Sequence, residues 1–263
     1  MNAAPAHAPS SGQAPSLLAV IGVLLREPER LLDDSGASDR DRDRDRLAWL
    51  APKLLAITVI GAAIFGAVLG SYRGELQYLY AAVKTPLLLL VPMVIGLPAI
   101  RAFHHACEIE VPWSRLALTA LLAMARTAIL AAACGPVLWL YLSLEPDYHH
   151  AILVMVATLS AVACPGLVLL VRSMPSGGRH RPLATLASVA VLGLLLAQSG
   201  WLLRPFVVRP QSELSFLRPI EADVFSSLAS TRRSATGDYR EWETEGAGLL
   251  GREAPAPAKE PTP

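Results

Sequence analysis

Charge and aromatic rings are scarce in this sequence. Charged residues make up 17% of the 263 residues and aromatic residues 6%, whereas a soluble domain is about 25% charged. The shortage of charge argues against an ordinary soluble domain. The net charge of +1 leaves no basic surplus, so nucleic acid is not an expected partner.

Motifs of enzymes and of metal sites are also lacking. The three cysteines, Cys107, Cys134 and Cys164, show no CxxC spacing, and two fall within long apolar runs. They are therefore interpreted as small packing residues rather than as a redox or zinc site. The sequence holds no HExxH, no GxSG and no phosphate-binding loop. We expect no catalytic residue, no metal and no cofactor.

Five long apolar runs are what the sequence does contain, and its mean hydropathy is +0.42. Each run can supply the roughly 20 residues that an α-helix needs to cross a hydrocarbon core about 30 Å thick, where only a helix satisfies its own backbone groups at these lengths. The runs lie at about residues 54–72, 78–100, 118–144, 151–171 and 183–204. The sequence predicts an all-α, polytopic membrane protein, with a bundle of five transmembrane helices in residues 51–208.

An N-terminal segment, residues 1–50, precedes the first run. Leu17–Leu25 is apolar, but no Lys or Arg comes before it, so it is not interpreted as an export signal. We expect Ser16 to cap an amphipathic helix there and Pro28 to limit it. This helix is too short to span a bilayer and is expected to lie in the membrane interface. The alternating Asp and Arg of residues 39–46 predict a solvated spacer.

The chain after the fifth run divides in two. Residues 209–232 carry apolar side chains at helical spacing, which predicts an amphipathic segment on the outer leaflet or across the end of the bundle. Its apolar positions are Leu217, Ile220, Val224, Phe225 and Leu228. Residues 233–263 are rich in Pro, Ala, Glu and Gly, and we expect them to be disordered.

Lys and Arg gather on alternate sides of the predicted spans. Ten of them flank the side of the N-terminus and of the second and fourth loops, whereas Arg73 alone lies in the first and third loops. Because cytoplasmic loops carry the excess of basic residues, we expect a cytoplasmic N-terminus and an extracytoplasmic C-terminus. Arg204, Arg209 and Arg218 after the fifth span weigh against this orientation. The expected location is a bacterial inner membrane.

Glycines and prolines occur within the apolar runs and bear on how the predicted helices pack and bend. Gly61, Gly66 and Gly70 lie in the first run, the last two at GxxxG spacing, which favours close helix packing within the chain over a dimer face. Pro136 and Pro165 fall in the third and fourth runs. They predict two kinked helices that could frame a cavity.

Two ionisable residues lie inside the runs, where a charge is costly. For Arg126 two interpretations stay open: the side chain snorkels to the cytoplasmic interface, or the third span begins later. Lys84 falls in the expected outer half of the second span, on the face where the fifth span ends. We place a candidate cluster on this face, formed by Lys84, Pro86, Gln198, Trp201, Arg204, Pro205 and Phe206. It is either a structural lattice of ion pairs and headgroup contacts or a polar vestibule for a ligand, a lipid headgroup or a partner.

Two segments of the chain resemble a known family. Residues 80–90, YAAVKTPLLLL, are similar to the A-V-K-x-P-L-L-L-L stretch of a family of uncharacterised polytopic inner-membrane proteins of bacteria. Residues 198–206, QSGWLLRPF, are similar to its Q-x-G-W-x-L-R-P-F stretch. The resemblance covers about residues 50–228 and implies that Lys84 and Arg204 act together. It implies no activity. Its five-span plan is similar to that of Yip-type membrane proteins, which are associated with membrane organisation.

Three functions stay open at this point. We favour a non-enzymatic scaffold or accessory subunit that packs against another membrane protein or against itself. A small oligomeric transporter or channel component is the first alternative, although the chain shows no internal repeat. A lipid-modifying enzyme is the second. It would need a nucleophile or base, for which only Glu145, Asp147, His149 and His150 qualify.

Overall fold

A computed structural model describes residues 16–32, 40–72, 76–144, 147–174 and 180–203 of the chain. The described residues form helices and turns and contain no strand. Five of the helices are long and apolar enough to cross a membrane, which confirms the predicted fold class. In chain order the helices are α1 Leu17–Arg26, the short 3₁₀-helix η1 Pro28–Leu31, α2 Arg40–Gly70, α3 Gln77–Ala106, α4 Trp113–Leu142, α5 Tyr148–Ser173 and α6 Arg181–Leu203.

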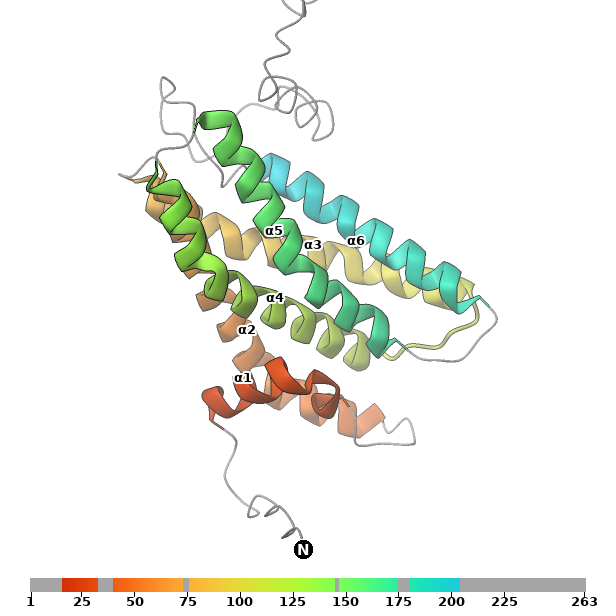
Figure 1. Ribbon diagram of the computed structural model, residues 1–263. Coiled ribbons are helices and arrows are strands. Elements are labelled where there is room, and N and C mark those ends of the chain that lie inside the picture. Colours follow the sequence, from red (N-terminus) through yellow and green to blue (C-terminus); the bar gives the residue numbers. More distant parts are fainter. Residues whose placement is uncertain (1–15, 33–39, 73–75, 145–146, 175–179, 204–263) are drawn as a thin grey trace, which may run out of the picture.

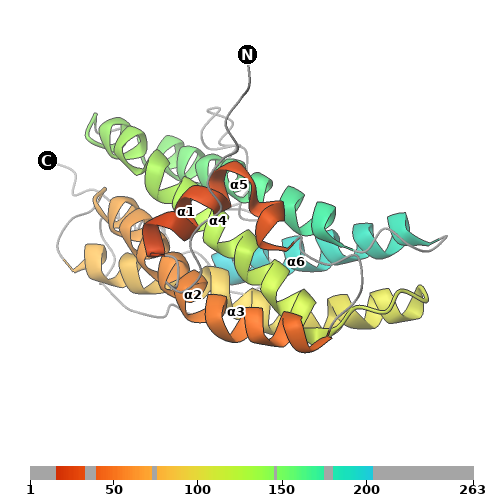
Figure 2. The ribbon, with the colours of Figure 1, turned by 90° about the horizontal axis from the view of Figure 1, so that it is seen from below.

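The short helix α1 forms where the sequence predicts it. Ser16 caps it, because its side-chain oxygen accepts a hydrogen bond from the backbone N–H of Ala19 at 3.3 Å. Val20 and Leu24 are buried in an apolar cluster with residues of α2 and α4, including Leu122. Figures 1 and 2 show α1 crossing the bundle near the start of α2 rather than running parallel to the long helices.

The alternating Asp and Arg residues, for which the sequence predicts a solvated spacer, belong to a helix in which Arg44 and Asp45 are exposed. From Arg40 onward they are the first turns of α2, continuous with the apolar span. The alternation places opposite charges three residues apart and like charges four residues apart, so the pairs give the helix little net stabilisation. The guanidinium of Arg46 also donates to the carbonyl oxygen of Leu32 at 3.5 Å, which ties α2 to the end of η1.

The long helices pack in the spatial order α6, α3, α2, α4, α5. Helix α2 packs against both α3 and α4, whereas α5 packs mainly against α4 and α6 mainly against α3. Contacts between α5 and α6 are few, although the two lie on the same side of the bundle (Figure 1). Helix α4 is therefore the most buried of the candidate spans, and α5 and α6 are the most exposed.

Glycines let α2 approach its two neighbours closely. A Cβ added at Gly70 would lie 2.5 Å from the carbonyl oxygen of Gln77 in α3, and one at Gly61 would lie 2.8 Å from that of Ala128 in α4. At Gly66 an added Cβ would overlap the carbonyl oxygen of Ala81. These contacts confirm the prediction that the glycines of the first span pack within the chain.

The connection from α3 to α4 is folded tightly against the bundle. Glu108, directly after the C-cap residue Cys107, has a φ of 60°, a left-handed conformation that usually calls for glycine. The backbone N–H of Ile109 donates to the carbonyl oxygen of His104 at 2.9 Å, as in a Schellman cap. Ile109 and Val111 are buried in the main apolar cluster, so the core compensates for the strained backbone.

Candidate functional site

The residues of the predicted outer-face cluster are only partly within the described chain. Lys84 and Pro86 are buried in α3, with Lys84 only 4% exposed, and Gln198 is exposed on α6. Trp201 belongs to the last turn of α6. Arg204, Pro205 and Phe206 lie outside the described residues, as do the predicted segments 209–232 and 233–263.

The packing of α3 on α6 bears on this cluster. A Cβ added at Gly200 would lie 3.5 Å from a methyl carbon of Leu88. The last turn of α6 therefore lies beside α3 one turn from Lys84. That Lys84 and Arg204 act together in one cluster stays a prediction.

His104 and His150 lie at opposite ends of the bundle. His104 is buried at the C-terminal end of α3, where its Nδ1 lies 2.8 Å from the carbonyl oxygen of Ile100. His150 lies at the start of α5, at the opposite end of the bundle, 3.9 Å from a carboxylate oxygen of the exposed Asp147. Within the described chain, no group of three His, Cys, Asp or Glu side chains could hold a metal ion.

Basic residues gather at the end of the bundle where α2, α4 and α6 begin and α3 and α5 end, which we call the basic end. Two of its cations lie over indole rings. The Nζ of Lys53 is 4.0 Å from the centroid of the Trp49 ring, and the Cζ of Arg101 is 4.5 Å from that of Trp113. Such pairs are typical of a membrane–water interface, where a ring and a cation are both stable. The other basic residues described here are Arg26, Arg30, Arg44, Arg46, Arg115, Arg172 and Arg181.

Arg126 lies near the middle of α4 and is half-buried. Its Nε is enclosed and has no hydrogen-bond partner among the described residues, and the same holds for the Nε of Arg115 and the hydroxyl of Ser173. Helix α4 runs without interruption from Trp113 to Leu142, so Arg126 lies inside the helix, and the two interpretations of its place in the membrane stay open. The sequence singled out Arg126 because it interrupts an apolar run, but only the packing shows that its Nε is enclosed.

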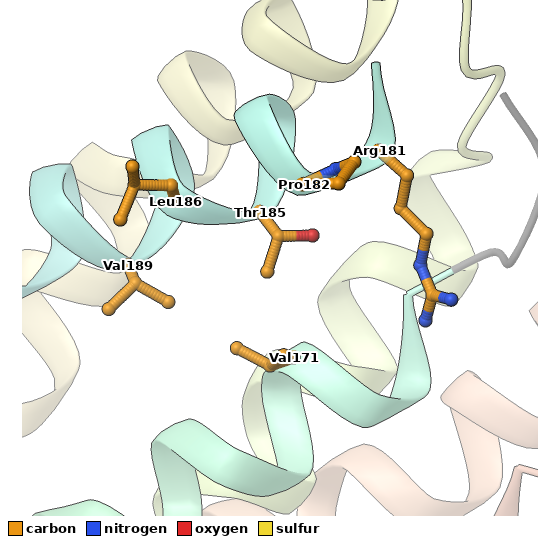
Figure 3. A pocket seen from close by; sticks show the side chains of 6 residues that line it. All are labelled: Val171, Arg181, Pro182, Thr185, Leu186 and Val189. Atoms are coloured by element: carbon orange, nitrogen blue, oxygen red, sulfur yellow. The ribbon is translucent and has the colours of Figure 1, made fainter. Parts of the chain in front are cut away.

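A shallow hollow of about 410 Å³ separates α5 from α6 near the basic end. Its wall is mostly apolar, and the guanidinium of Arg181 reaches past it toward the end of α5 (Figure 3), where it donates to the carbonyl oxygen of Met174 at 3.5 Å. The lining residues are Val171, Arg181, Pro182, Thr185, Leu186 and Val189. This hollow could not be predicted from the sequence, because it arises from how few contacts α5 and α6 make. The predicted cavity between the third and fourth spans is not formed at Gly166, where α4 and α5 are in direct contact.

The outward face of α5 differs from that of every other span. Its exposed residues between the two ends of the helix are small, apart from Val168, and they recur every three or four positions. They are Ala157, Ser160, Ala161 and Cys164. The outward faces of α2, α3, α4 and α6 carry large apolar side chains, such as Ile60, Val94, Leu140 and Leu194.

No family model, curated protein or solved structure matches this chain.

Proposed function

We propose that this protein is a non-enzymatic scaffold or accessory subunit of a membrane complex, and that α5 packs against a transmembrane helix of another protein or of a second copy. Five helices with the length and composition of membrane spans support the integral membrane part of this proposal. The observation that carries the rest is the face of small residues on α5, defined by Ala157, Ser160, Ala161 and Cys164.

Small residues matter in a membrane because apolar burial no longer drives helix association. Lipid tails are as apolar as leucine, so helices associate through close van der Waals packing and hydrogen bonds, which small side chains permit. Close packing at small residues already occurs within the chain, where Gly61 packs on α4 and Gly166 of α5 packs against Ala123. The small-residue face of α5 has the same composition on the outside of the bundle.

We further propose that the basic end faces the cytoplasm of a bacterial cell and that the chain ends on the other side of the inner membrane. The gathering of Arg and Lys at one end of the bundle supports this orientation, because cytoplasmic flanks of membrane spans are rich in both residues.

Cysteine crosslinking in native membranes tests the small-residue face directly. Cys164 is exposed on this face, whereas Cys107 and Cys134 are half-buried. We expect a short bifunctional maleimide to give a specific adduct, either a homodimer or a complex of defined mass, that disappears in Cys164→Ala. As a matched control, the single exposed cysteine is moved to α6 by Leu194→Cys in the Cys164→Ala chain. Equal adducts from both positions, or none from Cys164, would contradict the proposal.

A further inference from the structure

The guanidinium of Arg126 lies at a depth where a bilayer offers no partner. Helix α4 contains 30 residues and is therefore about 45 Å long, whereas a hydrocarbon core is about 30 Å thick. Arg126 is about 20 Å along the axis from Trp113, at the basic end, and about 24 Å from Leu142. With α4 centred in the membrane, the Cα of Arg126 lies close to the midplane.

The part of the chain that the structure describes supplies no negative charge at this depth. The segments that contain the spans, with their immediate flanks, have neither Asp nor Glu. These segments are residues 47–72, 76–107, 111–144, 148–174 and 180–203. The acidic residues that the structure describes lie beyond these segments, near the ends of helices or in connections. The described residues therefore supply no counter-charge for Arg126 in the membrane.

The path from Arg126 to the lipid headgroups at the basic end is covered by α1. Leu122 lies one turn from Arg126 on the same face of α4, toward the basic end, and is fully buried in the cluster that contains Val20 and Leu24 of α1. An arginine in a helix extends toward the N-terminus, which here means toward α1, and the enclosed Nε agrees with this direction. Figure 2 shows α1 crossing α4. A lipid phosphate therefore has no open route along this face.

In the opposite direction Ile129 and Leu130 are half-buried against apolar clusters, and the same face of α4 is open from Ala133 onward. Ala133, Val137 and Leu140 follow Arg126 at helical spacing and are exposed, Val137 to 73%. This surface is apolar, it begins with a small residue, and it has Arg126 at one end. A second helix that lay along it and continued for about two turns toward the basic end would bring its own side chains to the level of Arg126.

We infer that the α4 surface formed by Arg126, Ala133, Val137 and Leu140 binds a partner transmembrane helix that carries an Asp or Glu near its middle. This inference rests on the proposed function as an accessory subunit and names the chemistry of its partner. A carboxylate accepts charge-assisted hydrogen bonds from a guanidinium in a planar, paired geometry. Each charge alone has a high free energy in a membrane, and pairing the two lowers this cost. Assembly through Arg126 is therefore selective for a helix with an acidic residue at one depth.

The test uses the full chain reconstituted in phosphatidylcholine vesicles and synthetic transmembrane peptides as probes. Three peptides share a Leu- and Ala-rich sequence and differ only at the central residue, which is Glu, Gln or Ala. Energy transfer between labelled protein and labelled peptide gives the affinity. The wild-type chain is expected to bind the Glu peptide about fivefold or more tightly than the Gln peptide, a ratio typical of a polar contact between membrane helices.

Variants test whether the preference for the Glu peptide depends on Arg126. The preference for the Glu peptide is expected to vanish in Arg126→Ala, to persist in part in Arg126→Lys, and to be unchanged in Arg172→Ala, which removes an exposed cation at the basic end. Equal affinity of the wild-type chain for the Glu and Gln peptides overturns the inference, even if Arg126→Ala does not fold. A preference for Glu that survives Arg126→Ala overturns it as well.

A lipid phosphate as the true ligand would give a different pattern. In vesicles with added phosphatidylglycerol, the wild-type chain would then retain more of this lipid in native mass spectrometry than Arg126→Ala, and it would show no preference among the peptides. That result also overturns the inference. The crosslink at Cys164 distinguishes failure of this inference from failure of the proposed function. It reports on the small-residue face of α5 and does not depend on Arg126.

Discussion

At the scale of single residues, the packing of the bundle depends on glycines, which have no side chain. Gly66 of α2 lies against the backbone of Ala81 and the hydroxyl of Thr85, both in α3. A larger residue has no room there unless the two helices separate, and over-packing of this kind costs about 1–3 kcal/mol or more. Gly193 of α6, by contrast, has no atom within 4 Å of an added Cβ.

The variant Gly66→Leu should therefore lower the melting temperature of the detergent-solubilised protein by several degrees. Gly193→Leu is the matched control, since it adds the same side chain to a membrane helix in open space, and it should leave the melting temperature nearly unchanged. Similar losses in both variants would show that α2 and α3 are not packed as described.

Glu108 allows the converse experiment, in which a side chain is removed. It has a side chain, although its backbone conformation favours glycine. A left-handed residue other than glycine costs about 1–2 kcal/mol. Glu108→Gly should raise stability by about 1 kcal/mol after the entropy gained by the unfolded chain is subtracted, whereas Glu108→Val should lower it. Thermal unfolding measures both, and Glu108→Ala, which keeps a side chain in the left-handed conformation, controls for the loss of the carboxylate. A destabilising Glu108→Gly would contradict the described backbone.

At the scale of elements, α1 covers part of α4. Leu24 is fully buried against α2 and α4, whereas Leu18 is 77% exposed. A charge at Leu24 would have to enter an apolar cluster, so Leu24→Asp should detach α1, and Leu18→Asp should not. The readout is maleimide labelling of a cysteine placed at Leu122 in a chain without other cysteines. Labelling that is fast in the wild-type background, or equal in both variants, would show that α1 does not cover α4.

The elements also show how far the sequence could predict the structure. Apolar length identified all five spans, because the membrane requires it, but the helices extend beyond the apolar runs. Arg40–Arg46 is helical before the first span and Arg101–Ala106 after the second. Hydropathy marks the part of a helix that lies in lipid, and it gives no information on turns that continue into water or headgroups.

The candidate sites depended on information that a single sequence does not carry. The ionisable residues Lys84 and Arg126 could be identified because they interrupt apolar runs. The enclosure of Arg126 could not, since it needs α1 and α4 to meet across about 100 residues of chain. The small residues of α5 were visible in the sequence, but only the packing against α4 shows which of them face outward.

At the scale of the whole molecule, the five spans form an open arrangement rather than a closed bundle. Helix α4 is enclosed on most sides, while α5 and α6 contact few residues of each other and expose most of their surface. A partner that covered α5 would complete the bundle on the side where the exposed residues are small. The central claim is that the small-residue face of α5 is an assembly surface.

The most direct test of this claim is the mass of the complex extracted from native membranes in nanodiscs. Ala161→Leu fills the small-residue face of α5, and Ala190→Leu adds the same atoms to an exposed position of α6. We predict a complex larger than the monomer for the wild type and for Ala190→Leu, and association weakened about tenfold or more for Ala161→Leu. A wild-type chain that is monomeric, or an Ala161→Leu chain that assembles as well as the wild type, would contradict the account.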